Sequence, residues 1–257
     1  MKLYQVDAFT DALFAGNPAA VVPLTHWLDD ALLQNIALEN NLSETAFLVP
    51  DDQGYALRWF TPQVEVDLCG HATLATAWVV FNALGFPGER VRFSTASGPL
   101  FVTCSGQTLS LDFPSRPAHA LTDITPFSRA LDLPIREVRQ ARDSLIIVDS
   151  ADQVRNFQPD FTAIAALDTF AVMISAPGDD CDFVSRFFAP AKGVPEDPVT
   201  GSAHCTLVPY WADKLGKNTL HARQLSARGG ELHCQLKGDR VTLSGTARCY
   251  LQGDLQL

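Results

Sequence analysis

The sequence predicts an α+β fold of two pseudo-symmetric halves, each a curved mixed β-sheet or barrel wrapped around a central helix. Two observations lead to this prediction. Motifs of the first half recur in the same order in the second half, and each half holds one apolar helix between segments rich in aromatic and β-branched residues. With 47% hydrophobic residues, the chain has enough apolar material for a core in both halves.

Three groups of matching residues carry the internal repeat. In chain order they are RWFTP 58–62 with RFFAP 186–190, Gly70 with Gly201, and TLS 108–110 with TLS 242–244. Because the order of the matches is kept, duplication explains them better than chance. We therefore predict two halves, residues 1–115 and residues 120–257, joined where the proline-containing segment FPSRPAHA breaks the periodicity.

Strands and one central helix are predicted in each half. The segments LRWFTP, VRFST, LFVTC and TLSLDF are typical of strands. The helix that follows Gly70 is apolar on nearly every side, so a curved sheet must cover it all round. Its counterpart is predicted from about Ser202 to Leu215, ending at Gly216, a residue type that commonly ends helices.

Charge and hydropathy exclude several classes of protein. The formal net charge is −10 and no basic run is present, whereas a nucleic-acid-binding protein needs a basic surface. The longest nearly uncharged apolar stretch, residues 72–86, is shorter than the roughly 18–20 residues that span a bilayer. Asp7 and Asp11 interrupt any signal-peptide core. We expect a cytoplasmic protein with reduced cysteines that binds neither nucleic acid nor membrane.

Glu44, in the segment NLSETAF, is the first candidate for chemistry. It lies just before an apolar strand-like run, and the repeat aligns it with Val172, so the second half has no matching acid. A single acid in a cleft between two similar halves would suit one general acid/base. The alternative is an ordinary carboxylate at a helix end or strand edge.

Two predicted helix starts provide the other candidates. Gly70 lets the backbone turn and a ligand approach closely, and His71 would lie in the first helical turn. In the second half, Asp197 precedes the helix start at Gly201 and Ser202. Exposed N–H groups at such starts bind anionic oxygens, so a ligand with an anionic oxygen is expected there. The alternatives are a packed histidine and, for the serine, a residue that only caps its helix.

Several cofactor and metal motifs are absent. The chain has no GxGxxG, GxxxxGK[ST] or HExxH motif and no CxxC pair. Four histidines, at positions 119, 204, 221 and 233, show no metal-ligand spacing and are interpreted as surface or packed side chains. We therefore expect neither a nucleotide cofactor nor a bound metal.

Three long segments carry a family resemblance. NLSETAF, WFTPQVEVDLCGHATLA and FAPAKGVPEDPVTGSAH resemble the signature segments of the PhzF family, the phenazine-biosynthesis-like isomerases. The resemblance implies a diaminopimelate-epimerase-like fold, a homodimer, and a cofactor-free isomerase in which one Glu moves a hydrogen between carbons. In the best understood member the substrate is trans-2,3-dihydro-3-hydroxyanthranilate. The family's catalytic and binding residues match the candidate residues Glu44, Gly70, His71, Asp197 and Ser202.

Cys69 raises a second possibility. Two-cysteine racemases of the wider fold place one thiol before each central helix, and Cys69 occupies the first of these positions. The second is Thr200, whose hydroxyl has no accessible anion near neutral pH, so inversion by two bases is not expected. Two alternatives to an isomerase acting through Glu44 stay open. They are a single-cysteine racemase or epimerase and a protein that binds a small acid without changing it.

Overall fold

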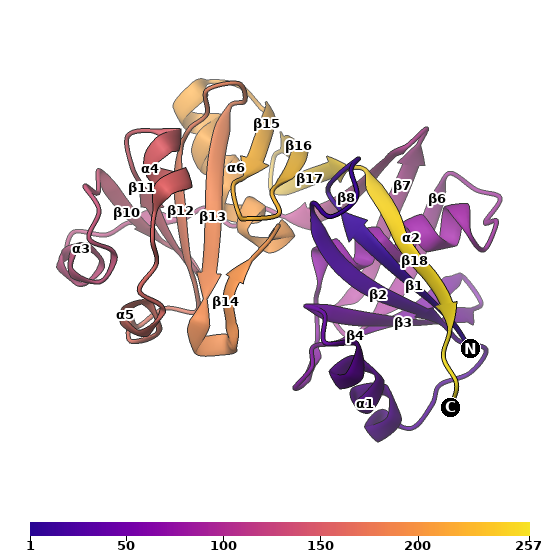
Figure 1. Cartoon of the computed structure of the whole chain (residues 1–257). Helices are drawn as coiled ribbons and strands as arrows, with labels where there is room; N and C mark the ends of the chain where they lie inside the picture. The colour runs from indigo at the N-terminus through magenta and orange to yellow at the C-terminus, as the bar shows by residue number, and fades with distance from the viewer. The chain divides into compact units, whose positions relative to one another are not determined.

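The computed structural model describes residues 1–257, and the chain divides into two compact units (Figure 1). Unit 1 consists of Met1–Asp112 and Ser244–Leu257, and unit 2 consists of Phe113–Leu243. Each unit combines strands with helices, so the predicted α+β class is confirmed. No helix of the chain is both long enough and apolar enough to cross a bilayer.

Unit 1 contains most of its strands in the first 114 residues. Its elements are β1 (Lys2–Ala8), β2 (Asn17–Pro23), α1 (Asp30–Asn40), β3 (Glu44–Asp51), β4 (Gly54–Phe60), β5 (Glu65–Val66), α2 (Gly70–Asn82), β6 (Arg90–Thr95), β7 (Gly98–Ser105), β8 (Thr108–Pro114) and β18 (Ala247–Asp254). The last strand is antiparallel to β1, from Lys2 opposite Asp254 to Ala8 opposite Ala247. Residues 247–254, predicted with the second half, thus complete the sheet of unit 1.

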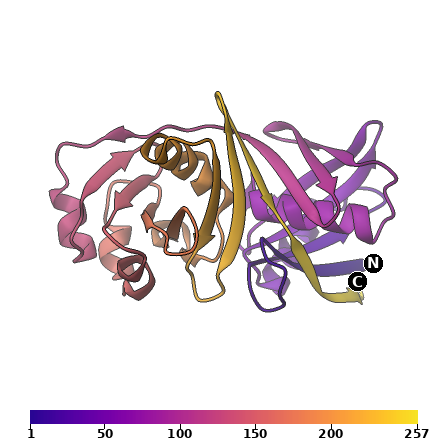
Figure 2. The same ribbon diagram turned by 90° about the horizontal axis from the view of Figure 1, so that it is seen from above.

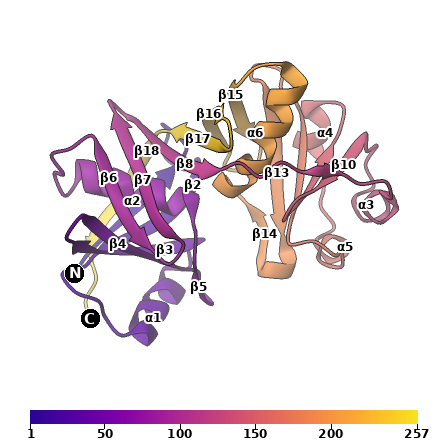
Figure 3. The same cartoon turned by 180° about the vertical axis from the view of Figure 1, so that it is seen from behind.

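Unit 2 follows a similar order of elements. They are β9 (His119–Ala120), α3 (Thr125–Leu131), β10 (Glu137–Gln140), β11 (Ser144–Ile147), α4 (Ala151–Asn156), α5 (Phe161–Ala165), β12 (Val172–Pro177), β13 (Phe183–Ala189), η1 (Pro190–Lys192), β14 (Val194–Asp197), α6 (Gly201–Leu215), β15 (Thr219–Gln224), β16 (Gly230–Lys237) and β17 (Arg240–Gly245). Compared with unit 1, it has a further helix before β10 and two short helices where unit 1 has α1. Figure 3 shows α6 beside β15 and β16.

Strand pairing repeats from one unit to the other. In unit 1, β2 is parallel to β3, β3 is antiparallel to β4, and β4 is parallel to β6. In unit 2, β11 is parallel to β12, β12 is antiparallel to β13, and β13 is parallel to β15. The predicted duplication is therefore visible in the topology of the sheets.

The pairing also corrects one detail of the predicted repeat. Phe60 and its counterpart Phe188 pair with Thr45 and Val172, respectively. Glu44 therefore corresponds to the alanine before Val172 and not to Val172 itself. Alignment along the chain missed this because the connection between the two paired strands is one residue longer in unit 2, so the offset of the matched motif does not hold before that connection. The second unit still has no acid at this place.

The central helix of unit 1 is covered on all sides, as predicted. Every residue of α2 from His71 to Ala77 is buried, and α2 contacts β1, β2, β3, β7 and β18 (Figure 2). Its buried hydroxyls do not lack partners, because Thr73 and Thr76 donate to the carbonyl oxygens of the residues four positions earlier. This packing fixes the start of α2, where the candidate residues lie.

Candidate functional site

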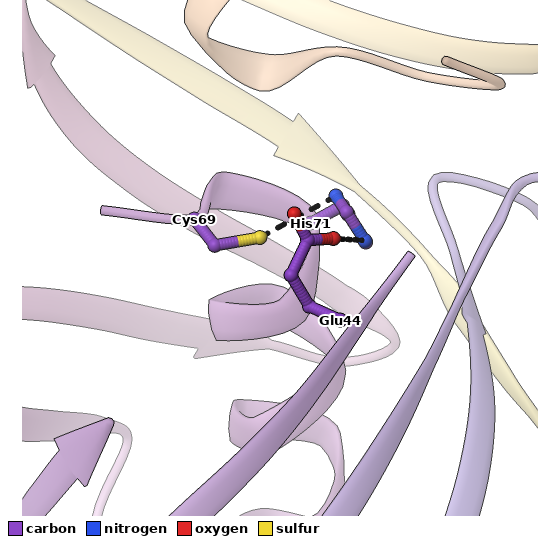
Figure 4. Close-up of side chains that lie close together, drawn as sticks. All are labelled: Glu44, Cys69 and His71. Carbon is purple, nitrogen blue, oxygen red and sulfur yellow. Dashed lines mark hydrogen bonds and ion pairs between the residues drawn. The ribbon is translucent and has the colours of Figure 1, made fainter. Parts of the chain in front are cut away.

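Glu44, Cys69 and His71 lie together in unit 1. Glu44 begins β3, Cys69 precedes α2, and His71 lies in its first turn. Figure 4 shows the carboxylate and the thiol both directed at the imidazole ring. Glu44 Oε2 lies 3.0 Å from His71 Nε2, and Cys69 Sγ lies 3.6 Å from His71 Nδ1. The packing of α2 against β2 and β3 brings these side chains together, although Glu44 is distant from His71 in the chain.

Asn17 is a further member that the sequence did not single out. Its side chain is fully buried at the start of β2, with Nδ2 3.2 Å from His71 Nδ1, and its Oδ1 accepts a hydrogen bond from Ser43 Oγ. Since an amide nitrogen only donates, the neutral imidazole carries its hydrogen on Nε2. The protonated ring has a hydrogen there as well, so in either form the nitrogen that lies 3.0 Å from Glu44 carries a hydrogen. The only signal in the sequence was that the segment containing Asn17, FAGNPAAVV, also resembles the PhzF family.

The protonation of His71 reflects opposing influences. Burial works against a charged imidazole, but the neighbouring Cys69 and Glu44 side chains outweigh it and hold the pKa of His71 above its ordinary value. The histidine is therefore suited to hold the Glu44 carboxylate in one orientation. His71 is packed at the start of α2, as the alternative expected, and it also has polar neighbours in Glu44, Cys69 and Asn17.

Cys69 is unsuited to act as a base near neutral pH. Burial, together with the negative charge of Glu44, raises the pKa of its thiol to about 11. The thiolate is the reactive form, so little of it is present at pH 7. The carboxylate, thiol and imidazole also offer possible metal ligands within 4.8 Å of one another. A thiol must lose its proton to bind a metal, and the raised pKa opposes that use as well.

The start of α2 leaves backbone N–H groups without a side-chain cap. Cys69 occupies the N-cap position with an extended backbone and makes no capping hydrogen bond. The first N–H groups of a helix have no partner within the helix, so an anionic oxygen can accept from them. Gly70, the first residue of α2, therefore lies where the sequence predicted an oxyanion-binding turn.

In unit 2, a short connection leads from β14 to α6. The candidate residue Asp197 ends the strand, and Thr200 lies in the connection. Gly201 and Ser202 follow as the first residues of the helix. Asp197 accepts a hydrogen bond from Thr200 Oγ1. Thr200 occupies the N-cap position but its side chain makes no capping hydrogen bond. Ser202 is the second residue of the helix, so the alternative that it caps the helix is wrong.

Gln224 holds this turn in place and was also missed. The buried Gln224 side chain accepts from the Thr200 N–H at 2.9 Å and donates to the Asp197 carbonyl oxygen at 2.7 Å. Ser226 adds a hydrogen bond to the carbonyl oxygen of Pro198. Gln224 and Ser226 come from β15 and the chain just after it, which no local motif connects with Asp197.

Equivalent arginine–glutamate pairs anchor the strands that precede both helix starts. Arg58 donates to both carboxylate oxygens of Glu65 on β5, each at 2.7 Å. Arg186 donates to Glu196 on β14 in the same way, at 2.7 and 2.9 Å. Two parallel hydrogen bonds fix the relative orientation of the two groups, so each pair ties its short strand to the neighbouring long strand.

His204, on α6, is a packed histidine and gives unit 2 a pH-dependent stability. Its Nδ1 lies 2.8 Å from the carbonyl oxygen of Thr200, and burial lowers its pKa to about 4. The folded state thus keeps His204 neutral while the unfolded state binds a proton below about pH 6.5. His204 therefore does not lower the free energy of unfolding above about pH 6.5. As the pH drops toward 4, the unfavourable contribution of His204 grows and lowers the free energy of unfolding by up to about 3 kcal/mol.

The measurement for this prediction is the free energy of unfolding at pH 7 and pH 4.5 for the wild type and His204→Gln. Glutamine can still donate to the Thr200 carbonyl oxygen but does not titrate. We expect a smaller loss of stability between the two pH values in the variant. Equal losses in the two proteins would show that His204 does not titrate as described.

Comparison with known proteins assigns a family. The family model of PhzC-PhzF, the phenazine biosynthesis-like proteins, matches residues 6–253. An uncharacterized isomerase of Pseudomonas aeruginosa is 50% identical over 257 residues, with 100% of this chain and 99% of the relative covered. A phenazine biosynthesis-like domain-containing protein of Homo sapiens is 39% identical over 296 residues, with 99% of each covered.

Solved structures support the same family assignment. A PhzF-family protein of Enterococcus faecalis superposes with a TM-score of 0.98 at 47% identity, over 100% of this chain and 99% of that one. A hydroxyproline epimerase from Agrobacterium vitis shares only the fold, with a TM-score of 0.62 at 13% identity over 98% of this chain and 91% of that one. The diaminopimelate-epimerase-like fold that the motifs implied is thus shown. The chain belongs to the PhzC-PhzF family of phenazine biosynthesis-like proteins.

Proposed function

We propose that the protein is an isomerase that moves a hydrogen between carbons of a small carboxylate, with Glu44 as the general acid/base. The observation that carries the proposal is the geometry of Glu44. Its side chain is 17% exposed, and its carboxylate lies 3.0 Å from a buried imidazole nitrogen. It is thus held in place while still open to solvent. Relatives with half of their residues identical to this chain are named isomerases.

The proposed reaction needs only groups of the chain. Glu44 takes a proton from an activated carbon and delivers it to another carbon of the same molecule, so no net oxidation occurs. The carbanion-like intermediate needs hydrogen-bond donors already in place, and one such donor is worth about 3 kcal/mol. The uncapped N–H groups at Gly70 and His71 are suited to this task. His71 holds the carboxylate and Asn17 holds His71.

The proposal gives Gly201 and Ser202 the binding of the substrate carboxylate through the N–H groups at the start of α6. Asp197, like His71, has a catalytic part in it, because it orients the substrate through a hydrogen bond. The support comes from unit 2 itself, where the start of α6 has no side-chain cap and Gln224 fixes the turn before it. We propose that a homodimer carries out the reaction, as the resemblance implies, and that it does so in the cytoplasm, the location expected from the sequence. The substrate class is a small cyclic amino acid or an enamine-type acid.

Incorporation of deuterium from solvent tests the proposal. The wild-type protein is incubated in D₂O with trans-2,3-dihydro-3-hydroxyanthranilate and a panel of small cyclic amino acids, and products are analysed by mass and proton spectra. We expect at least one compound to gain deuterium at carbon. Compounds that stabilise the protein against heat without gaining deuterium would instead favour a binding protein.

Substitution of Cys69 separates the proposal from a single-cysteine racemase. We expect Cys69→Ser to keep most of the exchange rate, because the thiol, with a pKa of about 11, is protonated at pH 7 and Glu44 performs the transfer. The rate is measured on the compound that exchanges with the wild type. A loss as large as that caused by removing Glu44 would favour the thiol as the base.

A further inference from the structure

Three possible metal ligands meet on the surface of unit 2, and none of them belongs to the site around Glu44. His221 on β15 lies directly opposite His233 on the antiparallel strand β16. Glu231 precedes His233 by two positions and therefore points to the same face of the sheet. Along the chain the two histidines show no ligand spacing, and only the pairing of the strands places them side by side.

The side chains are close enough for one ion to reach all three. His221 Nε2 contacts the Glu231 carboxylate, and the two imidazole rings are stacked with centroids 4.9 Å apart. The nearest ligand atoms of the three residues all lie within 4.8 Å of one another. The side chains of His221 and Glu231 are 28% and 46% exposed, so an ion from solvent can enter. An ion pair between His221 and Glu231 would give His233 no role in the cluster. A bound cation would instead be coordinated by all three side chains.

We propose that His221, Glu231 and His233 bind a zinc ion or a similar borderline divalent metal. Two imidazole nitrogens and one carboxylate oxygen are typical zinc ligands, whereas calcium and magnesium prefer oxygen ligands throughout. Zinc bonds of about 2.0–2.2 Å place tetrahedral ligand atoms about 3.3–3.6 Å apart. Because His233 is exposed, rotation of its side chain supplies the small closure that this requires.

A bound ion would connect β15 and β16 through their side chains. Metal that binds the folded state and not the unfolded state raises stability in proportion to its occupancy. We therefore expect zinc to raise the thermal midpoint of the full-length protein. This effect is independent of the proposed isomerase activity, because none of the three ligands belongs to the site around Glu44.

Calorimetric titration of metal-free, full-length protein with zinc chloride tests the site. We expect one zinc per chain in the wild type. Loss of a residue that only hydrogen-bonds to a metal ligand weakens metal affinity about 10–100-fold. His233→Ala removes a ligand itself, so it should weaken zinc affinity by at least about tenfold. His233 is exposed, so this variant should fold normally. His119→Ala, which removes another exposed histidine, should bind zinc like the wild type.

Equal zinc affinity in His233→Ala and the wild type would overturn the proposal. If Cys69→Ser lost zinc binding in the same experiment, the ion would occupy the buried group of Glu44, Cys69 and His71. A rise of the thermal midpoint with zinc in the wild type, absent in His233→Ala, would support the site by a second measurement.

Discussion

Glu44→Gln should lower the rate of hydrogen exchange and of turnover by at least about a hundredfold, the usual contribution of a general acid/base. Glutamine has nearly the same shape, so its side-chain oxygen can still face His71 Nε2. It cannot take a proton from carbon and deliver it again at neutral pH. Binding of the substrate should change little, because the backbone N–H groups at the start of α2 are unaffected. The measurement is the rate of deuterium incorporation from D₂O.

Glu39→Gln provides the matched control for this prediction. It makes the same chemical change on the exposed surface of α1, five residues earlier in the chain, and should leave the rate unaltered. A Glu44→Gln protein that exchanges hydrogen at the wild-type rate would show that another group is the base. Thermal unfolding of each variant establishes that the loss of rate does not come from loss of fold.

Glu196→Gln is expected to cost about 3 kcal/mol of unfolding free energy. The substitution leaves the Arg186 guanidinium without its carboxylate in a largely buried position, and the cost of breaking a buried ion pair is several kcal/mol. Two backbone carbonyl oxygens, of Val154 and Phe157, still accept from Arg186, so the arginine stays in place as an uncompensated charge. Urea unfolding monitored by tryptophan fluorescence and circular dichroism provides the measurement.

The internal repeat supplies the control for this experiment. Glu65→Gln makes the same change in the equivalent pair of unit 1, where the Glu65 side chain is 40% exposed. Solvent-exposed ion pairs contribute up to about 1 kcal/mol, and Arg58 keeps a second partner in Asp30. We expect the Glu65 variant to lose clearly less stability than the Glu196 variant. Equal losses would show that burial does not determine the strength of these two pairs.

Local patterns in the sequence were sufficient for the fold class and for part of the site. The apolar helix after Gly70 could be recognised because its composition requires burial on every side. The duplicated motifs indicated two similar units and identified the two helix starts at Gly70 and Gly201, whereas no motif predicted the elements of residues 118–168. The signature segments indicated Glu44 and His71, and the structure places the two side chains in contact. Their chemical roles stay proposals.

Contacts between distant segments were decided only by the tertiary structure. Asn17 reaches His71, Gln224 holds the turn at Thr200, and β18 pairs with β1, yet none of these pairs is near in sequence. The facing histidines of β15 and β16 are a further example. Spacing along a chain reports which side chains share a helix or strand face. Which strands become neighbours, and in what register, depends on how the whole sheet buries its apolar surface, and that is settled only when the chain is folded.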